Sequence, residues 1–306
     1  MQDYPLISVV IPSFNQGQFI EQTILSVIGQ HYPNLEVLVL DGGSTDNTVD
    51  ILQKYSQYLD YWHSQKDGGQ ADAINKGMEL SSGDIVCWLN SDDMYLPGSL
   101  LDIGERFRGR THQKLLIHGG ALVAKEDSQG NFINAKAQLS APLENPQGLT
   151  YKNFMVQPSA FWTRHLWEVA GVLNPAYSYI LDWEWFIRAS QKGHFEYVPK
   201  YYSVYRYHPD HKTTSGGDKK LKEILEIIEN YSSNNLKNVY KQIYQNRTLI
   251  QNRLNLYKKI KLYGLLKRIG FKNPIRLLFP TIGKTVKSDD EFWKGMNLLH
   301  MCRNNK

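Results

Sequence analysis

The chain has 306 residues, a formal net charge of +5, and a composition that is 42% hydrophobic and 21% charged. These values are typical of a soluble globular protein and exclude a disordered or fibrous class. The length predicts one large α/β domain with an appendage, or two modest domains. Cys87 and Cys302 form no CxxC pair, which disfavours a zinc site or a disulfide framework and favours a reducing compartment.

The charge is divided unevenly along the chain. Residues 218–306 hold 19 Lys and Arg against 7 Asp and Glu, whereas residues 1–217 hold 16 against 23. An acidic front suits catalytic and metal-binding carboxylates, and a basic tail suits anionic lipid, phosphate or nucleic acid. The amino terminus lacks the pattern of a secretory signal, and no run of about 18 apolar residues occurs, so the sequence predicts a cytoplasmic protein whose membrane contacts are peripheral.

The first third of the chain alternates between strand and helix patterns. Apolar, β-branched runs predict strands at residues 6–12, 35–41, 61–64 and 84–90. Apolar residues at helical spacing predict helices at residues 19–30, 47–57 and 70–80. Thr45 or Asp46 is placed to cap the second helix. Short joints between such elements predict a parallel sheet covered on both faces, with ligands bound outside the carboxyl ends of its strands.

After residue 97 the pattern is less regular. The segments LLIHGGALVA, NFINAKAQL and YYSVYRYH predict further strands, the last at residues 201–208. Helices are predicted at residues 159–173, closed by Gly171, and at 181–193. Beyond the turn-rich KTTSGGDKK, helical spacing and a capping box that begins at Ser288 predict a basic, helical extension. The expected domains are therefore residues 1–215 and 216–306.

Acidic residues stand directly after two of the predicted strands. Asp92 and Asp93 follow the strand at 84–90, and hard carboxylate oxygens there can hold a divalent cation that neutralises a diphosphate; the alternative is a turn or helix cap. Asp41 stands at the tip of its strand before Gly-Gly-Ser-Thr-Asp. It is placed either to hydrogen bond a base or ribose or to serve the turn alone.

Six segments follow one another in a characteristic order: ISVVIPSFN, LEVLVLDGGSTDNTVDIL, DGGQADAINKGMELSSGDIVCWLNSDDMYLPGSL, VQPSAFW, LDWEWFIRASQKG and YRYHPDHKTTS. Together they resemble bacterial glycosyltransferase family 2, inverting enzymes of the GT-A fold, over about residues 5–215. The resemblance implies a Rossmann-like, mostly parallel sheet flanked by helices. It also implies transfer of a sugar from a nucleoside-diphosphate sugar, by default a UDP-sugar, to a hydroxyl of a glycan or lipid-linked saccharide in cell-surface polysaccharide synthesis.

The same resemblance assigns donor-side and metal-binding roles. The positions that match nucleotide-sugar-binding residues of the family are Pro12, Ser13, Asn15, Asp41, Gln70, Asp72, Asn75 and Asp92. Asp92 and Asp93 match the DxD region that binds Mn²⁺ or Mg²⁺, and His208 lies in a segment that resembles the one closing over the phosphates. Position 90 is Asn where many relatives have Asp, so the sequence leaves open which carboxylate binds the metal directly. An exposed loop histidine is the alternative for His208.

Asp182 matches the carboxylate of the family's ED motif, although Leu181 replaces the usual acid before it. The resemblance implies that Asp182 is the catalytic base, which takes the proton of the acceptor hydroxyl during in-line displacement. Glu184 is the alternative base; two positions apart on a helix, the two carboxylates point to different faces. Gln157 and Trp183 are assigned to the acceptor, with a place in the core as the alternative for Trp183 and Trp185. Arg206 either contacts phosphate or pairs with an acid.

The sequence leaves open the role of the basic tail and allows two competing functions. The segment KKIKLYGLLKRIGFKNPIRLLF predicts either docking on the anionic inner leaflet or a helical hairpin that packs on the catalytic domain or pairs two subunits. A nucleotidyltransferase would carry a Gly-rich basic loop after the first strand, and IPSFNQGQF has no basic residue. The basic tail alone suggests a non-catalytic nucleic-acid-binding protein. The acidic front and the missing recognition motifs weigh against it, so no nucleic acid partner is expected.

Overall fold

The computed structural model describes residues 4–127, 131–209, 211–212, 216–250 and 252, and the chain divides into two compact units. The first unit comprises residues 1–146 and 154–213. The second comprises residues 147–153 and 214–306, so a short segment from the middle of the chain belongs with the carboxyl-terminal part. Within that unit, the Ser232 hydroxyl donates a hydrogen bond to the Thr150 carbonyl at 3.1 Å.

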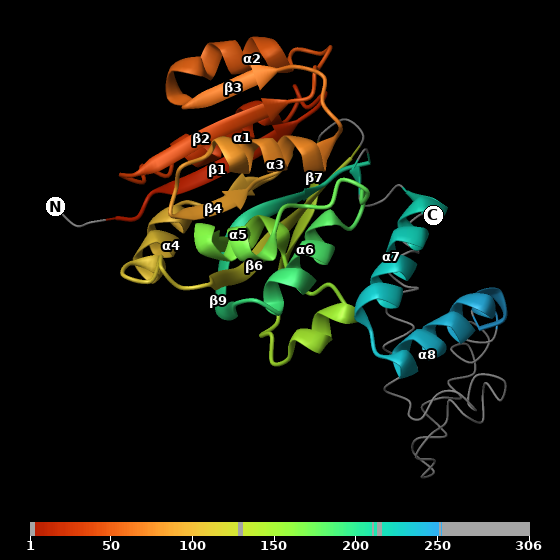
Figure 1. Cartoon of the computed structure of the whole chain (residues 1–306). Helices are drawn as coiled ribbons and strands as arrows, with labels where there is room; N and C mark the ends of the chain where they lie inside the picture. The colour runs from red at the N-terminus through yellow and green to blue at the C-terminus, as the bar shows by residue number, and fades with distance from the viewer. Residues whose placement is uncertain (1–3, 128–130, 210, 213–215, 251, 253–306) are drawn as a thin grey trace. The chain divides into compact units, whose positions relative to one another are not determined.

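The first unit is built on one nine-stranded sheet with the order β3-β2-β1-β4-β8-β6-β9-β5, and β7 pairs with β6 (Figure 1). The strands are β1 Ile7–Ser13, β2 Leu35–Asp41, β3 Tyr61–Ser64, β4 Ile85–Trp88, β5 Met94–Tyr95, β6 Leu115–Glu126, β7 Phe132–Gln138, β8 Ala160–Thr163 and β9 His194–Tyr207. Strands β1 to β4 are parallel to one another, and β6 is parallel to β9. The predicted α/β, mostly parallel architecture is therefore confirmed.

One edge of this sheet collects the ends of most strands. Strand β8 is antiparallel to both β4 and β6, so β4 and β6 run in the same direction, and β9 runs with them. The carboxyl ends of β1 to β4, β6 and β9 consequently lie along one edge, together with the start of β8. We call this edge the carboxyl edge.

Helices cover the sheet of the first unit. They are α1 Ile20–Ile28, α2 Thr48–Tyr55, α3 Gln70–Leu80, α4 Ser99–Phe107, α5 Arg164–Ala170 and α6 Leu181–Ser190. Figure 1 shows α1, α2 and α3 around the red and orange strands β1 to β3. Helix α3 lies very close to the sheet and needs glycine at position 77, since a Cβ there would stand 2.4 Å from the Val10 side chain.

The prediction of a helix across residues 159–173 is wrong in its first part. Ala160–Thr163 is strand β8, and the helix begins only at Arg164. A short run of buried apolar residues fits a central strand as well as a helix, and pairing with β4 and β6 decides between them. The Thr163 hydroxyl then accepts a hydrogen bond from the Leu166 N–H at 3.2 Å, which caps α5. Helix α4 and strand β5 lie in a region where the sequence predicts no definite element.

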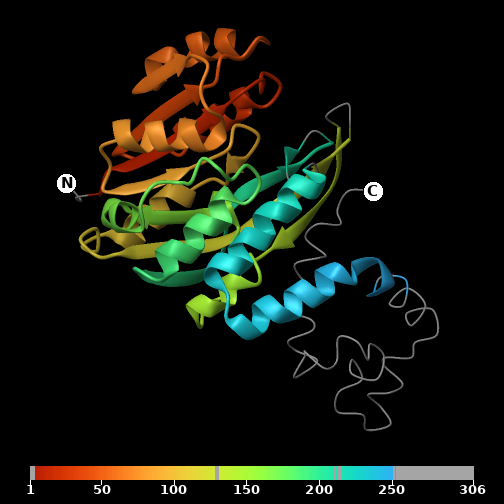
Figure 2. The ribbon, with the colours of Figure 1, turned by 45° about the vertical axis from the view of Figure 1, so that its right-hand side comes forward.

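The second unit contains α7 Gly217–Tyr231 and α8 Asn234–Gln245, which meet at a short link (Figure 2). The basic stretch 258–279 and the helix predicted to begin at Ser288 lie outside the described residues. Membrane docking and subunit pairing through that region therefore stay predictions. None of the described helices is both long enough and apolar enough to cross a bilayer.

A buried histidine makes the fold sensitive to acid. His118 of β6 is 0% exposed, packs near the Phe195 and Tyr197 rings, and has no hydrogen-bond partner for either ring nitrogen among the described residues. Burial lowers the pKa of His118 from 6.5 to about 4. The folded protein therefore keeps this imidazole neutral where the unfolded chain protonates it.

We predict that this difference lowers the free energy of unfolding as the pH falls from about 6.5 towards 4. The loss from His118 alone is about 2 kcal/mol between pH 7.5 and pH 5, because the unfolded state binds the proton first. Urea denaturation of the wild type and of His118→Leu at both pH values measures it. The variant should lack this part of the acid sensitivity, and equal losses in the two proteins would contradict the prediction.

Candidate active site

Polar residues from several strands meet along the carboxyl edge. The register places Ser13 of β1 beside Asp41 of β2, and Asp41 beside Ser64 of β3. Asn90, Asp92 and Asp93 follow β4, His208 follows β9, and Gln157 stands just before β8. The topology therefore brings most of the predicted donor-side and metal-binding positions to one side of the molecule.

The loops after β1 and β2 hold each other. Asn15 has a φ of 52°, a left-handed conformation that Asn tolerates. Its N–H donates to the Ser44 hydroxyl at 2.7 Å, and its side-chain oxygen accepts the Thr45 N–H at 2.9 Å. Pro12 and Ser13 are buried at the end of β1, and the Ser13 hydroxyl has no hydrogen-bond partner in the described part of the chain. Asn15 thus ties the two loops that the sequence assigns to the nucleotide.

Asp41 is fully buried and surrounded by donors from the protein itself. One carboxylate oxygen accepts the Ser44 hydroxyl at 2.5 Å. The other accepts the Ser44 N–H at 2.9 Å, the Gly43 N–H at 3.2 Å and the Ser64 hydroxyl at 2.6 Å. Asp41 therefore shapes the turn after β2 through hydrogen bonds with the protein itself.

The acidic pair after β4 is asymmetric. Asp93 is 0% exposed; one carboxylate oxygen accepts the Arg206 N–H at 3.0 Å, and the other has no partner among the described residues. Burial, together with the nearby Asp92 charge, raises the pKa of Asp93 well above its usual range. The Asp92 carboxylate lies 3.2 Å from Nε2 of His208. His208 is 4% exposed, so the exposed-loop alternative for this histidine does not hold.

This cluster fits a cation in part. Asp93 keeps a buried oxygen without a partner, and Nδ1 of His208 is likewise buried without a partner in the described residues. Carboxylate oxygens and imidazole nitrogens are suitable ligands for a divalent metal. Within the described part of the chain, however, no three His, Cys, Asp or Glu side chains stand ready to hold a metal by themselves. Further ligands would have to come from the substrate or from water.

An unpredicted series of amide contacts runs along the same edge. Lys212 Nζ donates to Gln70 at 2.9 Å, and the Gln70 amide donates to Asn90 at 2.9 Å. The Asn90 amide lies 3.4 Å from the Gln157 oxygen, and Gln157 in turn donates to the Trp88 carbonyl at 2.9 Å. Asn90 and Lys212 are the two side chains of this series that the sequence did not assign to the site. The signal for Asn90 was the neutral amide at a position where many relatives of the resembled family carry an acid.

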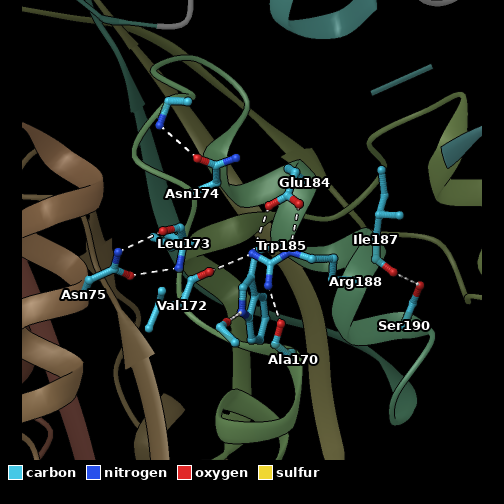
Figure 3. Close-up of polar contacts among 12 residues, drawn as sticks. Asn75, Ala170, Val172, Leu173, Asn174, Glu184, Trp185, Ile187, Arg188 and Ser190 are labelled. Carbon is cyan, nitrogen blue, oxygen red and sulfur yellow. Dashed lines mark hydrogen bonds and ion pairs between the residues drawn. The ribbon is translucent and has the colours of Figure 1, made fainter. Parts of the chain in front are cut away.

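Two other donor-side candidates on α3 are engaged with the protein. Asp72 is exposed and accepts the Gly68 N–H at 3.0 Å, which holds the glycine turn before the helix. The Asn75 amide makes two hydrogen bonds of 2.8 Å to the backbone of Leu173 (Figure 3). The structure thus places Asn75 against the link between α5 and α6.

Helix α6 carries the proposed base in its first turn. It ends three residues before β9 begins, so its first turn, with the half-buried Asp182, lies towards the carboxyl edge. Glu184 is 3% exposed, and its two oxygens contact Arg188 at 2.7 and 2.9 Å (Figure 3). This ion pair commits Glu184 to Arg188 and weighs against it as the alternative base.

The aromatic and cationic candidates are mostly core residues. Trp183 and Trp185 are 1% and 0% exposed, and the Trp185 ring packs against Trp88, Trp162 and Trp167. Arg206 is 2% exposed, forms an ion pair with Glu126 at 3.1 Å and lies over the Phe19 ring. The alternative in which Arg206 pairs with an acid therefore describes the structure.

Comparisons with known proteins agree with this architecture. Residues 8–118 match the model of Glycosyl transferase family 2. TuaG of Bacillus subtilis, named as a teichuronic acid biosynthesis glycosyltransferase, is 40% identical over 94 residues, which are 30% of this chain and 37% of that protein. A glycosyltransferase of Rickettsia bellii is 31% identical over 132 residues, 42% of this chain and 19% of that protein. The chain thus spans well under half the length of these relatives.

A solved structure extends the likeness to nearly the whole chain. S. aureus TarS 1–349 in complex with UDP-GlcNAc superposes with a TM-score of 0.55 at 18% identity and covers 97% of this chain and 89% of that one. At this identity the likeness concerns the fold, which is that of the GT-A class of glycosyltransferases. The family likeness itself concerns residues 8–118, about a third of the chain, which are similar to glycosyl transferase family 2.

We predict that Asp41→Asn destabilises the protein even without a donor. The amide keeps one acceptor oxygen and turns N–H groups towards hydroxyl and backbone donors, which costs about 1–3 kcal/mol. Urea denaturation of the ligand-free protein measures the change. Asp50→Asn, on the exposed side of α2, is the matched control and should shift the free energy of unfolding by only a few tenths of a kcal/mol. Equal stabilities of the two variants would leave Asp41 without the structural role described above.

Proposed function

We propose that the first unit is an inverting glycosyltransferase. It moves a sugar from a nucleoside-diphosphate sugar, with UDP as the expected nucleotide, to a hydroxyl of a glycan or lipid-linked saccharide. The observation that supports this most is the contact of Asp92 with His208 beside the buried Asp93, at the edge where strands β1 to β3 also end. The printed names of relatives point the same way: TuaG is named for teichuronic acid biosynthesis, and TarS was solved with UDP-GlcNAc.

In this proposal Asp182 is the general base. Its carboxylate takes the proton of the acceptor hydroxyl as that oxygen forms a bond to the anomeric carbon. The bond from the anomeric carbon to the diphosphate oxygen breaks on the opposite face, and the electron pair leaves with the nucleoside diphosphate. The commitment of Glu184 to Arg188 supports Asp182 over its neighbour for this task.

The metal site is part of the same proposal. Asp92, Asp93 and His208 would hold Mn²⁺ or Mg²⁺. The buried Asp93 oxygen, which has no partner among the described residues, supports this assignment. A bound cation would neutralise charge on the departing diphosphate. Asp93 itself is buried among protein groups, so Asp92, at 16% side-chain exposure, is the carboxylate nearer to an incoming donor.

The remaining roles follow the order of the loops along the edge. The loops that Asn15 and Asp41 hold together would enclose the nucleoside, with Gln70 and Asp72 next to the ribose and diphosphate. Gln157 would face the acceptor, and Trp183, which is buried in the first turn of α6, would support that side. We place the reaction at the cytoplasmic face, where a lipid-linked acceptor and the basic carboxyl-terminal region would meet the membrane.

The catalytic assignment predicts that Asp182→Asn separates binding from transfer. The amide cannot take the acceptor proton, so transfer should fall by a factor on the order of 10² to 10⁴. Donor affinity, measured by calorimetry, should stay nearly constant. Glu168→Gln, an exposed change on the neighbouring helix α5, is the control and should transfer at the wild-type rate. Unchanged transfer in Asp182→Asn would remove this residue from the role of base.

The donor and metal assignments are tested together by thermal denaturation. UDP-, GDP- and dTDP-sugars are added with and without Mn²⁺. A UDP-sugar with Mn²⁺, at about 100 times its Kd, should raise the midpoint by roughly 5–10 °C, because ligand that binds only the folded state stabilises it.

The variants Asp92→Ala and Asp93→Ala should lose the metal-dependent part of that rise, while Asp50→Ala keeps it. A metal-dependent rise that survives in both acidic-pair variants would show that the cation binds elsewhere. A rise with every donor except the UDP-sugars would contradict the choice of nucleotide.

A further inference from the structure

The last residue of α5 and the first three residues of the link to α6 form the segment 170–173, which we call the strap. It turns at Gly171, whose φ of +80° lies in the left-handed region that favours glycine. Beyond the strap the chain continues to Leu181, where α6 begins, and Asp182 is the second residue of that helix. The conformation of the strap therefore influences where the first turn of α6 lies.

Side chains of α6 hold three consecutive carbonyls of the strap (Figure 3). Arg188 donates to the carbonyls of Ala170 and Val172, the second at 2.8 Å. Between them, the indole N–H of Trp185 donates to the Gly171 carbonyl at 2.9 Å. The strap is thus fastened to the helix that follows it, although seven residues separate the two.

Glu184 fixes the direction of Arg188. Its buried carboxylate accepts two hydrogen bonds from the guanidinium, a bidentate arrangement that sets the plane of the Arg188 group. The other N–H bonds of the guanidinium then point at the strap carbonyls of Ala170 and Val172. The pair is a fixed unit, and lysine in place of Arg188 would keep the charge but lose the fork.

The fourth residue of the strap is held from another helix. Asn75 of α3 accepts the Leu173 N–H and donates to the Leu173 carbonyl, each at 2.8 Å. Leu173 is itself 0% exposed. Aspartate at position 75 would keep the acceptor but lose the donor, so asparagine is the residue that satisfies both backbone groups.

The strap consequently joins two helices with different tasks in the proposed reaction. Helix α3 begins with Gln70, which contacts Asn90 beside the acidic pair. Helix α6 begins with the turn that carries Asp182. In-line transfer depends strongly on the distance between donor and base, and a misplacement of about 1 Å can cost on the order of 10²-fold in rate.

We propose that Asn75 and Arg188 are positioning residues for transfer. Through the strap they fix the first turn of α6 relative to α3, and they touch neither substrate. This inference rests on the proposed function. It replaces the donor-binding role that the sequence suggests for Asn75 with a role in positioning the base relative to the donor.

The experiment uses the full chain with Asn75→Ala, Asn75→Asp and Arg188→Lys. The matched control is Asn174→Ala, which removes a neighbouring, exposed asparagine side chain that accepts the Ala176 N–H. For each protein we would measure kcat, donor KM, the stoichiometry of donor binding, and hydrogen exchange at the Leu173 amide. All assays are run well below the thermal midpoint.

The three strap variants should lower kcat by about 10- to 100-fold. Donor KM should stay within about threefold and donor stoichiometry at one per chain. Exchange at Leu173 should accelerate in Asn75→Ala, and Asn174→Ala should match the wild type in every measurement. The two conservative variants give the same test if Asn75→Ala does not fold.

Three results would overturn the inference. One is an unchanged kcat in the strap variants. Another is a rise in donor KM at constant kcat, which would make Asn75 a donor ligand. The third is a fall in kcat matched by the same fall in donor stoichiometry, which would mean loss of folded protein. Failure of the proposed function is distinct: the wild type would transfer no sugar while Leu173 exchange still responded to Asn75→Ala.

Discussion

The buried carboxylate of Asp93 is the interaction around which the carboxyl edge is organised. A buried carboxyl group needs hydrogen-bond partners close by, and the Arg206 N–H from β9 supplies one. Thr23 of α1 lies within hydrogen-bonding distance of the Ser91 and Asp93 carbonyls, and Arg206 reaches back to Gln22 of the same helix at 2.6 Å. The end of β4 is thereby fixed to α1 and to β9, which joins the amino-terminal strands to the later half of the sheet. The positions of Asp92 and His208 depend on these contacts.

Several side chains that match substrate-binding positions are used by the protein to hold its own loops. Asp41 accepts hydrogen bonds from the turn after β2 and from Ser64 of β3, Asn15 ties that turn to the loop after β1, and Asn75 holds the strap. Such contacts restrict the loops before a ligand arrives, so less conformational entropy is lost on binding. A residue that matches a substrate-binding motif can therefore contribute to a site indirectly, by ordering the backbone of a loop.

The elements of the first third of the chain are predictable because each has a clear hydrophobic periodicity and is connected to the next by a short loop. Residues 160–163 are not, since the strand or helix character of a four-residue apolar run depends on the strands beside it. The roles of single side chains cannot be predicted from the sequence for a related reason. The sequence shows two acids at 182 and 184, but only the position of Arg188 reveals that Glu184 is engaged. Likewise, the partners of Asn90 come from segments 20 and 67 residues away.

The contacts of Asn90 also explain why a neutral residue suits that position. From Lys212 through Gln70 and Asn90 to Gln157, each side chain donates to the next, and Gln157 donates to the Trp88 carbonyl. A carboxylate at position 90 could accept from Gln70 but could not donate onward. It would also add negative charge beside Asp92 and Asp93, where burial already raises the pKa of Asp93. The amide preserves the donor-to-acceptor direction of this series and avoids a third negative charge beside Asp92 and Asp93.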